Sequence, residues 1–200
     1  IPMEAGLGGG SGNAATALLG LNLVFGEPLG AEAMQRLAAA LGSDVPFFLQ
    51  SAPALATGRG EEVQSLEPFV ALQGFCFLLI HPGFGVSTPW AYKNLARFPA
   101  ALNGDKGRAQ RLVQSLGSSL EKARGDFYNS LEAPVLEKYP LLTIFQEFLL
   151  EHGASMALMS GSGSTTFALV EGRNRADQIK EKLEAKFGDT NWVGTVEVTP

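Results

Sequence analysis

Residues 6–12 restrict the fold of this chain more than any other stretch. Five of these seven residues are glycine, and an apolar run with small residues, 13–22, follows at once. Glycine has no Cβ atom, so such backbone can turn several N–H groups toward one point and let an anion approach closely. A helix that begins directly afterwards adds unpaired N–H donors and the positive end of its dipole. The sequence therefore predicts a phosphate-binding junction between a turn and a helix.

The composition of this junction separates it from two common phosphate-binding motifs. No Gly-Lys-Ser or Gly-Lys-Thr closes it, so it is not a Walker-type loop, and no strand-like run leads into it as in dinucleotide-binding folds. A helix N-terminus packed against a neighbour, without a ligand, stays open as the alternative. Ser11 and Asn13 lie where a side chain of the first helical turn could cap the helix or contact a phosphate or a metal ion.

Length and charge limit the classes of partner. The 200 residues can bury one sizeable core or two modest ones. The net charge is −5, and no block of Lys and Arg is longer than a pair, so neither nucleic acid nor an anionic membrane is an expected partner. Cys76, the only cysteine, lies in an apolar run and is expected to be a buried strand residue in a reducing compartment.

The ends and the apolar runs of the sequence give two further expectations. No apolar run reaches the length of a membrane span, and no secretory signal pattern is present. The chain does not begin with Met and opens within a motif, so we expect further residues before Ile1 in the natural protein.

The first third of the chain is predicted to hold two helices and a hairpin. Apolar periodicity indicates helices at 13–25 and 31–41, which are ended by Gly26-Glu27-Pro28 and by Gly42. Two short strand-like runs, 52–57 and 62–66, flank Gly58-Arg59-Gly60 and predict a hairpin. Composition changes near residue 70, where we place a domain boundary.

Beyond this boundary the elements alternate in kind. The sequence predicts helices at 87–95, 109–116, 141–151 and 174–187, and strands at 75–81, 154–158, 165–170 and 192–198. The order β-α-α-α-β-β-α-β indicates an α+β layer with its helices on one face of the sheet.

Two further segments could carry chemistry. Asp44 lies in Ser-Asp-Val-Pro-Phe-Phe, a predicted tight turn whose aromatic residues suggest partly dry surroundings. It is a candidate base, although an aspartate in such a turn is more often a local turn former. The glycine and serine run 160–165 is either a β-turn between two strands or a backbone surface that closes a cleft. His81 and His152 lack carboxylates at ligand spacing, so no histidine metal site is predicted.

Several of these segments resemble one family in order along the chain. Pro2, residues 6–11 and Ala14-Ala15 resemble the nucleotide-phosphate loop of the GHMP kinases. Residues 41–48 are similar to the family segment with the catalytic aspartate, 56–61 to its next landmark, and 158–168 to its C-terminal motif. The triple glycine followed by Asn-Ala-Ala is most similar to the branch that phosphorylates a cytidine-diphosphate-linked methylerythritol in the non-mevalonate isoprenoid pathway.

The resemblance implies a fold, a reaction and a location. The fold is the GHMP kinase fold: a partial N-terminal α/β domain (ribosomal protein S5 domain 2-like, the ATP-binding part) at 1–70, and a C-terminal ferredoxin-like α+β domain at 71–200. The reaction moves the γ-phosphate of ATP to a hydroxyl of the small-molecule substrate, with Mg2+ held mainly by ATP phosphates, so no residue is assigned as a metal ligand. The location is the bacterial cytoplasm or the plastid stroma.

The resemblance also assigns roles to particular residues. Asp44 is the expected catalytic residue, which accepts or orients the proton of the substrate hydroxyl. The expected ATP-binding residues are Pro2, Gly6, Leu7, Gly8, Gly9, Gly10, Ser11 and Asn13. The expected substrate-binding residues are Thr88, Tyr92, Gly161, Ser162, Gly163 and Ser164, with the ring of Tyr92 suited to stack on a pyrimidine.

The chain departs from the family pattern in three respects. Gly12 stands where the family usually has a second serine, and Ser130 replaces the aspartate of an Asn-Asp-x-Glu-x-Pro segment. The family's early lysine and its Tyr-His pair belong to a segment that would precede Ile1, and no lysine before Lys93 stands in for that lysine. Two alternatives therefore stay open: another GHMP kinase, of the homoserine or mevalonate type, or a non-catalytic nucleotide-binding module.

Overall fold

The chain forms two compact units. The computed structural model describes residues 1–188 and 191–198. Unit 1 comprises Ile1–Leu7 and Phe69–Pro200, and unit 2 comprises Gly8–Pro68. The first residues, which the sequence analysis grouped with 1–70, bond to unit 1: Val86 N donates to Glu4 O at 3.0 Å and Thr165 N to Ala5 O at 3.1 Å.

Unit 1 is built on a four-stranded antiparallel sheet. Its strands lie in the order β4-β5-β3-β6. Combined with the chain order β-α-β-β-α-β, this arrangement is the ferredoxin-like topology, so the fold class predicted for this half is confirmed. The register pairs Ile80 of β3 with Thr166 of β5 and with Val193 of β6. The strand bounds are β3 (Phe75–His81), β4 (Met156–Met159), β5 (Thr166–Glu171) and β6 (Trp192–Glu197).

The helices of unit 1 include three that the sequence pattern missed. The missed helices α4, α6 and α7 have four to seven residues, which is too short to display a helical period. The other four agree with the prediction to within one residue at each end. The helix bounds are α3 (Thr88–Leu95), α4 (Pro99–Asn103), α5 (Arg108–Leu116), α6 (Leu120–Ala123), α7 (Glu132–Lys138), α8 (Pro140–Glu151) and α9 (Arg173–Phe187), with 3-10 turns η2 (Val70–Leu72) and η3 (Arg124–Asp126).

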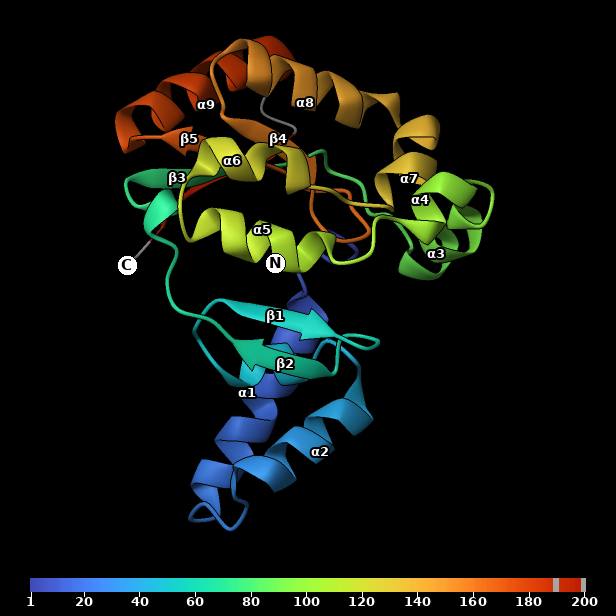
Figure 1. Cartoon of the computed structure of the whole chain (residues 1–200), viewed down its shortest axis with the longest axis vertical. Coiled ribbons are helices and arrows are strands. Elements are labelled where there is room, and N and C mark those ends of the chain that lie inside the picture. Colours follow the sequence, from blue (N-terminus) through green and yellow to red (C-terminus); the bar gives the residue numbers. More distant parts are fainter. Residues whose placement is uncertain (189–190, 199–200) are drawn as a thin grey trace. The chain divides into compact units, whose positions relative to one another are not determined.

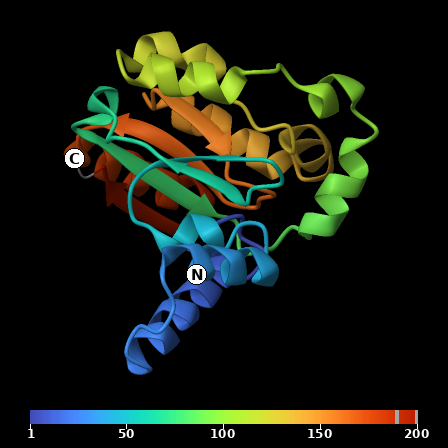
Figure 2. The same cartoon turned by 60° about the horizontal axis from the view of Figure 1, so that its bottom comes forward.

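Helices cover both faces of the sheet, so the prediction of helices on one face was wrong. On one face Leu78 and Ile80 of β3 pack in a cluster with residues of α8 and α9, such as Phe145. On the other, Phe75 and Phe77 pack with residues of α5 and α6. Figure 1 and the turned view in Figure 2 place these helix pairs on opposite sides of the strands. The cause is visible in β3, whose nearly continuous apolar run Phe-Cys-Phe-Leu-Leu-Ile requires cover on both faces.

Unit 2 combines two helices with a hairpin. Helix α1 begins four residues before its predicted start, so Gly9 and Gly10 belong to the helix rather than to a turn. Strands β1 and β2 pair as predicted, with Thr57 opposite Glu62. The bounds are α1 (Gly9–Val24), α2 (Ala31–Leu41), η1 (Pro46–Leu49), β1 (Ala54–Thr57) and β2 (Glu62–Ser65).

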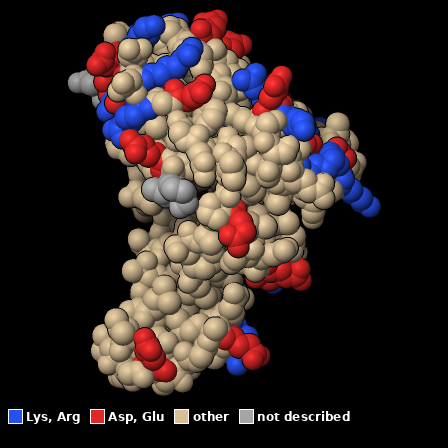
Figure 3. Space-filling view, turned by 60° about the vertical axis from the view of Figure 1, so that its left-hand side comes forward, with Lys and Arg blue, Asp and Glu red and all other residues tan. Residues whose placement is uncertain are grey.

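The core of unit 2 is small. Its buried apolar cluster consists of Ala15, Ala38 and Val45, with partly buried neighbours. The surface of the unit is correspondingly apolar, and the face in the lower part of Figure 3 carries few charged side chains. The large apolar side chains exposed on its helices are Leu19, Leu21, Leu23, Val24, Leu37 and Leu41.

Two expectations of the sequence analysis concern single features. Cys76 is buried in β3, as predicted, and its burial raises the pKa of the thiol. Among residues 1–188 and 191–198, no helix has both the length and the apolar character needed to cross a bilayer.

Candidate functional site

The two glycine-rich loops of the sequence meet at Gly6 within unit 1. Gly6 has φ +73°, and a Cβ atom added to it would lie 2.0 Å from the carbonyl oxygen of Ser160. Ser160 Oγ donates to Gly6 O at 2.8 Å. A Cβ atom on Gly161 would lie 3.1 Å from the same oxygen. Because only glycine fits this left-handed, close-packed position, the backbone of the first loop is fixed against the second.

The rest of the second loop uses its side chains inside unit 1. Ser162 Oγ and Thr88 Oγ1 share a hydrogen bond of 2.7 Å, so the structure brings two predicted substrate residues together. Ser164 is fully buried, and its hydroxyl donates to Phe84 O. The hydroxyl of Ser164 therefore stabilises the conformation of the loop. Gly161, in contrast, lies at the surface of the loop.

Helix α3 carries the remaining predicted substrate residues. Ser87 caps the helix by accepting a hydrogen bond from Trp90 N. Thr88 and Tyr92 are four residues apart, so both lie on one face of the helix. Both side chains are exposed, and the ring of Tyr92 is accessible for stacking.

In unit 2, the N-terminus of α1 is left without a side-chain cap. Gly8 is the N-cap in the left-handed conformation (φ +65°), and a Cβ atom on it would lie 2.4 Å from Cζ of Phe48. The first N–H groups of a helix have no partner within the helix, so those of Gly9, Gly10 and Ser11 are suited to hold an anion.

Besides Gly6, three predicted ATP-binding residues lie outside this turn. Asn13 is the fifth residue of α1, one turn further along than predicted, because the helix begins at Gly9. Its side chain is exposed and cannot act as a cap. Pro2 is exposed and Leu7 half-buried, and both belong to unit 1.

Asp44 follows α2 and is anchored by its neighbours in sequence. Val45 packs against Ala15 of α1, and the ring of Phe48 covers Gly8. A Cβ atom on Gly60 would lie 3.1 Å from Asp44 Oδ1, so the structure brings together the two segments that resemble family landmarks. The side chain of Asp44 is exposed, so the predicted partly dry surroundings are not found among the described residues.

The segment Asn129–Glu132 holds the second loop, which sequence reasoning did not predict. Asn129 Nδ2 donates to Gly161 O at 2.8 Å, and Glu132 accepts from Met159 N at 2.7 Å. In the sequence, this segment stands out only through its likeness to a family pattern. Its pairing with a loop about thirty residues away leaves no local signal in the sequence.

His81 makes a local contact in the turn that follows β3. His81 is buried at the end of β3, where burial lowers its pKa, and its Nδ1 accepts from Gly83 N at 3.2 Å. Within the part of the chain that the structure describes, no group of three or more His, Cys, Asp or Glu is placed to hold a metal ion.

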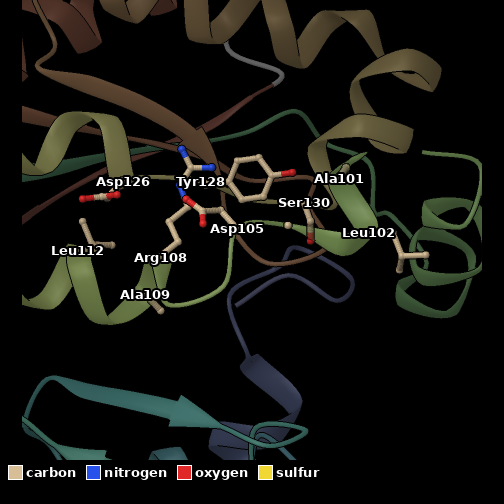
Figure 4. Close-up of a pocket in the computed structure, with 10 residues that line it drawn as sticks. Ala101, Leu102, Asp105, Arg108, Ala109, Leu112, Asp126, Tyr128 and Ser130 are labelled. Carbon is tan, nitrogen blue, oxygen red and sulfur yellow. The ribbon is translucent and has the colours of Figure 1, made fainter. Parts of the chain in front are cut away.

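A separate cavity of about 300 Å³ lies among the short helices of unit 1. Figure 4 shows its lining, which includes none of the predicted site residues. The guanidinium of Arg108 lies 4.4 Å from the ring centre of Tyr128. Arg111 forms ion pairs with Asp105 and Asp126. The acidic groups at this cavity are thus already paired with a cation of the same chain.

Two family descriptions match the sequence. "GHMP kinases N terminal domain" matches residues 1–52, and "GHMP kinases C terminal" matches residues 98–189. The matched ranges include the first glycine-rich loop, the Asp44 segment and the second glycine-rich loop.

Individual relatives agree with these matches. The 4-diphosphocytidyl-2-C-methyl-D-erythritol kinase of Syntrophotalea carbinolica is 39% identical over 94% of this chain and 64% of its own length. The enzyme of the same name from Synechococcus sp. (strain JA-3-3Ab) is 40% identical over 96% of this chain and 64% of its length. The chain therefore spans about 64% of the curated relatives it matches.

Solved structures show the same fold. A crystal structure of 4-(cytidine 5'-diphospho)-2C-methyl-D-erythritol kinase has a TM-score of 0.74 and 34% identity, covering 98% of this chain and 68% of that one. Homoserine kinase from Cytophaga hutchinsonii has a TM-score of 0.80 at 20% identity, covering 99% of this chain and 67% of that one. At the lower identity the likeness concerns the fold alone.

Proposed function

The chain belongs to the GHMP kinase family, and from this we propose that its protein transfers the γ-phosphoryl group of ATP to a hydroxyl of 4-diphosphocytidyl-2-C-methyl-D-erythritol. The observation that carries the proposal is the identity of 37–40% to relatives of that name over nearly the whole chain. The packing of Gly6 against the second loop supports it, because this close contact fixes the backbone that leads into α1.

The N-terminus of α1 is proposed to hold the ATP phosphates. Its N-cap, Gly8, has no side chain that would block an anion, and the N–H groups of Gly9 and Gly10 are proposed to donate to the phosphates. The hydroxyl of Ser11 adds a polar contact. Bound ATP supplies the phosphoryl group, and Mg2+, held mainly by its phosphates, neutralises charge there. Phosphoryl transfer needs positioning and charge stabilisation more than covalent help from the protein, and a backbone cradle meets that need.

Asp44 is proposed to accept or orient the proton of the acceptor hydroxyl. Its backbone is anchored after α2 by the buried Val45 and Pro46 that follow it. Thr88 and Tyr92 are proposed to bind the cytidine end of the substrate, with the aromatic ring stacked on the base. The backbone of the second loop, Gly161 to Ser164, is proposed to contact the substrate beside Thr88, within unit 1.

The proposal extends to domains and to location. Residues 1–70 are proposed to be part of the ATP-binding domain and 71–200 the C-terminal domain, consistent with the two family matches. The bacterial cytoplasm or the plastid stroma is the proposed compartment. Kinases acting on homoserine or mevalonate share the fold at 20% and 16% identity, and no observation favours their substrates.

An ADP-release assay on the natural protein that carries this sequence tests the proposal. ATP and magnesium are supplied with 4-diphosphocytidyl-2-C-methyl-D-erythritol, homoserine or mevalonate as acceptor. Asp44→Asn is expected to lower kcat about 10²–10⁴-fold, the range of a lost general base. Asp105→Asn is the matched control, because Asp105 pairs with Arg111 outside the proposed site. ADP release that does not depend on the cytidyl alcohol would overturn the proposed substrate. An unaffected Asp44→Asn variant would overturn the proposed base.

A further inference from the structure

We infer that Asn129 and Glu132 are positioning residues, which set the path of the second glycine-rich loop and through it the placement of Gly6. The inference rests on the proposed function only in assigning this loop to the kinase site. The contacts themselves all lie within unit 1.

All the hydrogen-bonding groups of the Asn129 side-chain amide bind backbone atoms of this region. Its Nδ2 donates to Met159 O and to Gly161 O, both at 2.8 Å. Its Oδ1 accepts from Leu131 N at 3.0 Å. An amide has two donor hydrogens and one acceptor oxygen, and all of these are used here. An aspartate would keep the acceptor and lose both donors, so the contact is specific to asparagine.

The carboxylate of Glu132 binds the backbone N–H of Met159, the residue that precedes the same loop. Its Oε1 accepts from Met159 N at 2.7 Å and from Gln146 Nε2 at 2.6 Å. Burial raises the pKa of the carboxyl, and the hydrogen bonds from Met159 and Gln146 oppose that rise. A buried carboxyl is costly unless it is hydrogen-bonded, so these two donors account for its retention.

The two side chains act together because both extend from the same turn of the chain. Glu132 N donates to Asn129 O at 3.1 Å, and Glu132 is the first residue of α7. Both side chains reach Met159, so they point to the same side of this turn. From that side, one side chain binds the carbonyls of Met159 and Gly161, and the other binds the N–H of Met159. Both the N–H and the carbonyl of Met159, the last residue of β4, are thus bound by this turn.

Movement of this loop would be passed directly to the first glycine-rich loop. Ser160 Oγ donates to Gly6 O, and the backbone of Gly161 lies against the same oxygen. The two loops are in close contact at this point, because even a Cβ atom at Gly6 would overlap Ser160 O. A misplacement of about 1 Å remote from the chemistry can reduce a rate by about 10²-fold.

The test uses the natural full chain with matched variants. Asn129→Asp removes both donations at unchanged size. Asn191→Asp is its control, because Asn191 also donates to a backbone carbonyl, Phe187 O at 3.4 Å, away from the loop. Glu132→Leu removes the acceptor, and Glu132→Gln restores an acceptor oxygen without the charge. Amide hydrogen exchange at 160–164, the KM for ATP, kcat and Tm are measured for each variant.

The inference predicts that Asn129→Asp and Glu132→Leu speed exchange in the loop at least about 10-fold and lower kcat/KM by 10-fold to about 10²-fold. Glu132→Gln should recover most of both losses, and Asn191→Asp should change neither. A core variant with an equal fall in Tm, such as Leu183→Ala, should leave loop exchange and the KM for ATP near wild type.

The outcomes separate this inference from the proposed function. Unchanged loop exchange in Asn129→Asp and Glu132→Leu would overturn the inference, whatever the enzyme acts on. Failure of Glu132→Gln to recover protection would remove the role of Glu132 as an acceptor. If exchange changes as expected but the wild-type protein does not phosphorylate the cytidyl alcohol, the proposed substrate fails and the positioning role stands.

Discussion

The two units bury very different amounts of apolar surface. Among the residues of unit 1 that the structure describes, the main buried cluster has nineteen members and lies against one face of the sheet, with a second cluster on the other face. The buried cluster of unit 2 has three residues, two of them alanine. Stabilisation grows with the apolar area removed from water, so unit 1 is expected to be the more stable part.

This difference bears on how the proposed site residues of each unit are held. The second glycine-rich loop stands on the ferredoxin-like sheet and on buried side-chain hydrogen bonds. The segments that carry Asp44 and the N-terminus of α1 are supported by the packing of Ala15, Val45 and the ring of Phe48. Helix α1 is apolar around its circumference, a property typical of buried helices. A buried leucine in a helix of unit 1 is therefore expected to contribute more to stability than an exposed leucine in α1 of unit 2.

A matched pair of Leu→Ala substitutions gives the largest expected difference. Leu149→Ala in α8, which is fully buried, should lower the free energy of unfolding by about 2–5 kcal/mol. Leu21→Ala in α1, with its side chain 58% exposed, should change it by less than about 0.5 kcal/mol. Urea unfolding followed by tryptophan fluorescence reports unit 1, because Trp90 and Trp192 both lie there. Amide exchange in α1 reports unit 2. An equally large cost for Leu21→Ala would show that Leu21 is buried in solution and would remove the contrast.

A matched pair of Gly→Ala substitutions should act in opposite directions. Gly6→Ala forces a Cβ atom onto Ser160 O, which costs about 1–3 kcal/mol by overpacking, and the left-handed φ adds about 1–2 kcal/mol. Gly20→Ala, inside α1 with open space around its Cβ position, should gain about 0.5–1 kcal/mol. Thermal unfolding and ATP affinity measure both effects. A Gly6→Ala variant that retains wild-type stability would refute the close contact between the loops.

The units should also differ in the sign of one pH dependence. Burial raises the pKa of Glu132 in unit 1, so the folded state keeps this proton to higher pH than the unfolded chain does. Its contribution to stability is present below the ordinary pKa of the carboxyl and is lost as pH rises through the raised pKa. Glu61 in unit 2 behaves oppositely, because hydrogen bonds from its own backbone N–H and from Arg59 lower its pKa. Its contribution is lost as pH falls through the lowered pKa.

Glutamine variants measure these two slopes. Relative to wild type, Glu132→Gln should gain stability as pH rises through the titration of Glu132. Glu61→Gln should gain relative stability as pH falls through the titration of Glu61. Unfolding of unit 1 and amide exchange of unit 2, followed from pH 3 to 8, provide the measurement. Slopes of the same sign would contradict the environments described for the two carboxyls.

The smallest expected effect concerns helix capping. In unit 1, Ser87 and Ser119 accept hydrogen bonds at the starts of α3 and α6, whereas α2 in unit 2 begins after Gly30 without a side-chain cap. Gly30→Asp should stabilise α2 by a few tenths of a kcal/mol, because a cap oxygen can accept from the first turn. Gly30→Ala is the control and should not stabilise. Equal exchange protection of α2 in both variants would show that the cap does not form.

Local patterns were sufficient for most of the secondary structure. The hairpin, β3 and the longer helices follow from apolar periodicity and from glycine or proline at their ends, which act over a few residues. The start of α1 was missed because glycine is a poor helix former, yet Gly9 and Gly10 occupy the first turn, where fewer helical hydrogen bonds are at stake. The cover on the second sheet face was missed because the period of α5 predicts a helix but not the sheet face on which it packs, and α6 is too short to show a period.

The sequence by itself determined the candidate residues of this protein: the glycine-rich loops, Asp44 and the apolar run of β3 are properties of neighbouring residues. The tertiary structure decided how these residues are held. It placed Gly6 against Ser160, turned the hydroxyl of Ser164 inward, left Asp44 exposed, and gave Asn129 and Glu132 their part in the second loop. The physical reason is range, since periodicity and turn preferences act within a few residues. Close packing and buried hydrogen bonds join residues as far apart as Ala5 and Thr165.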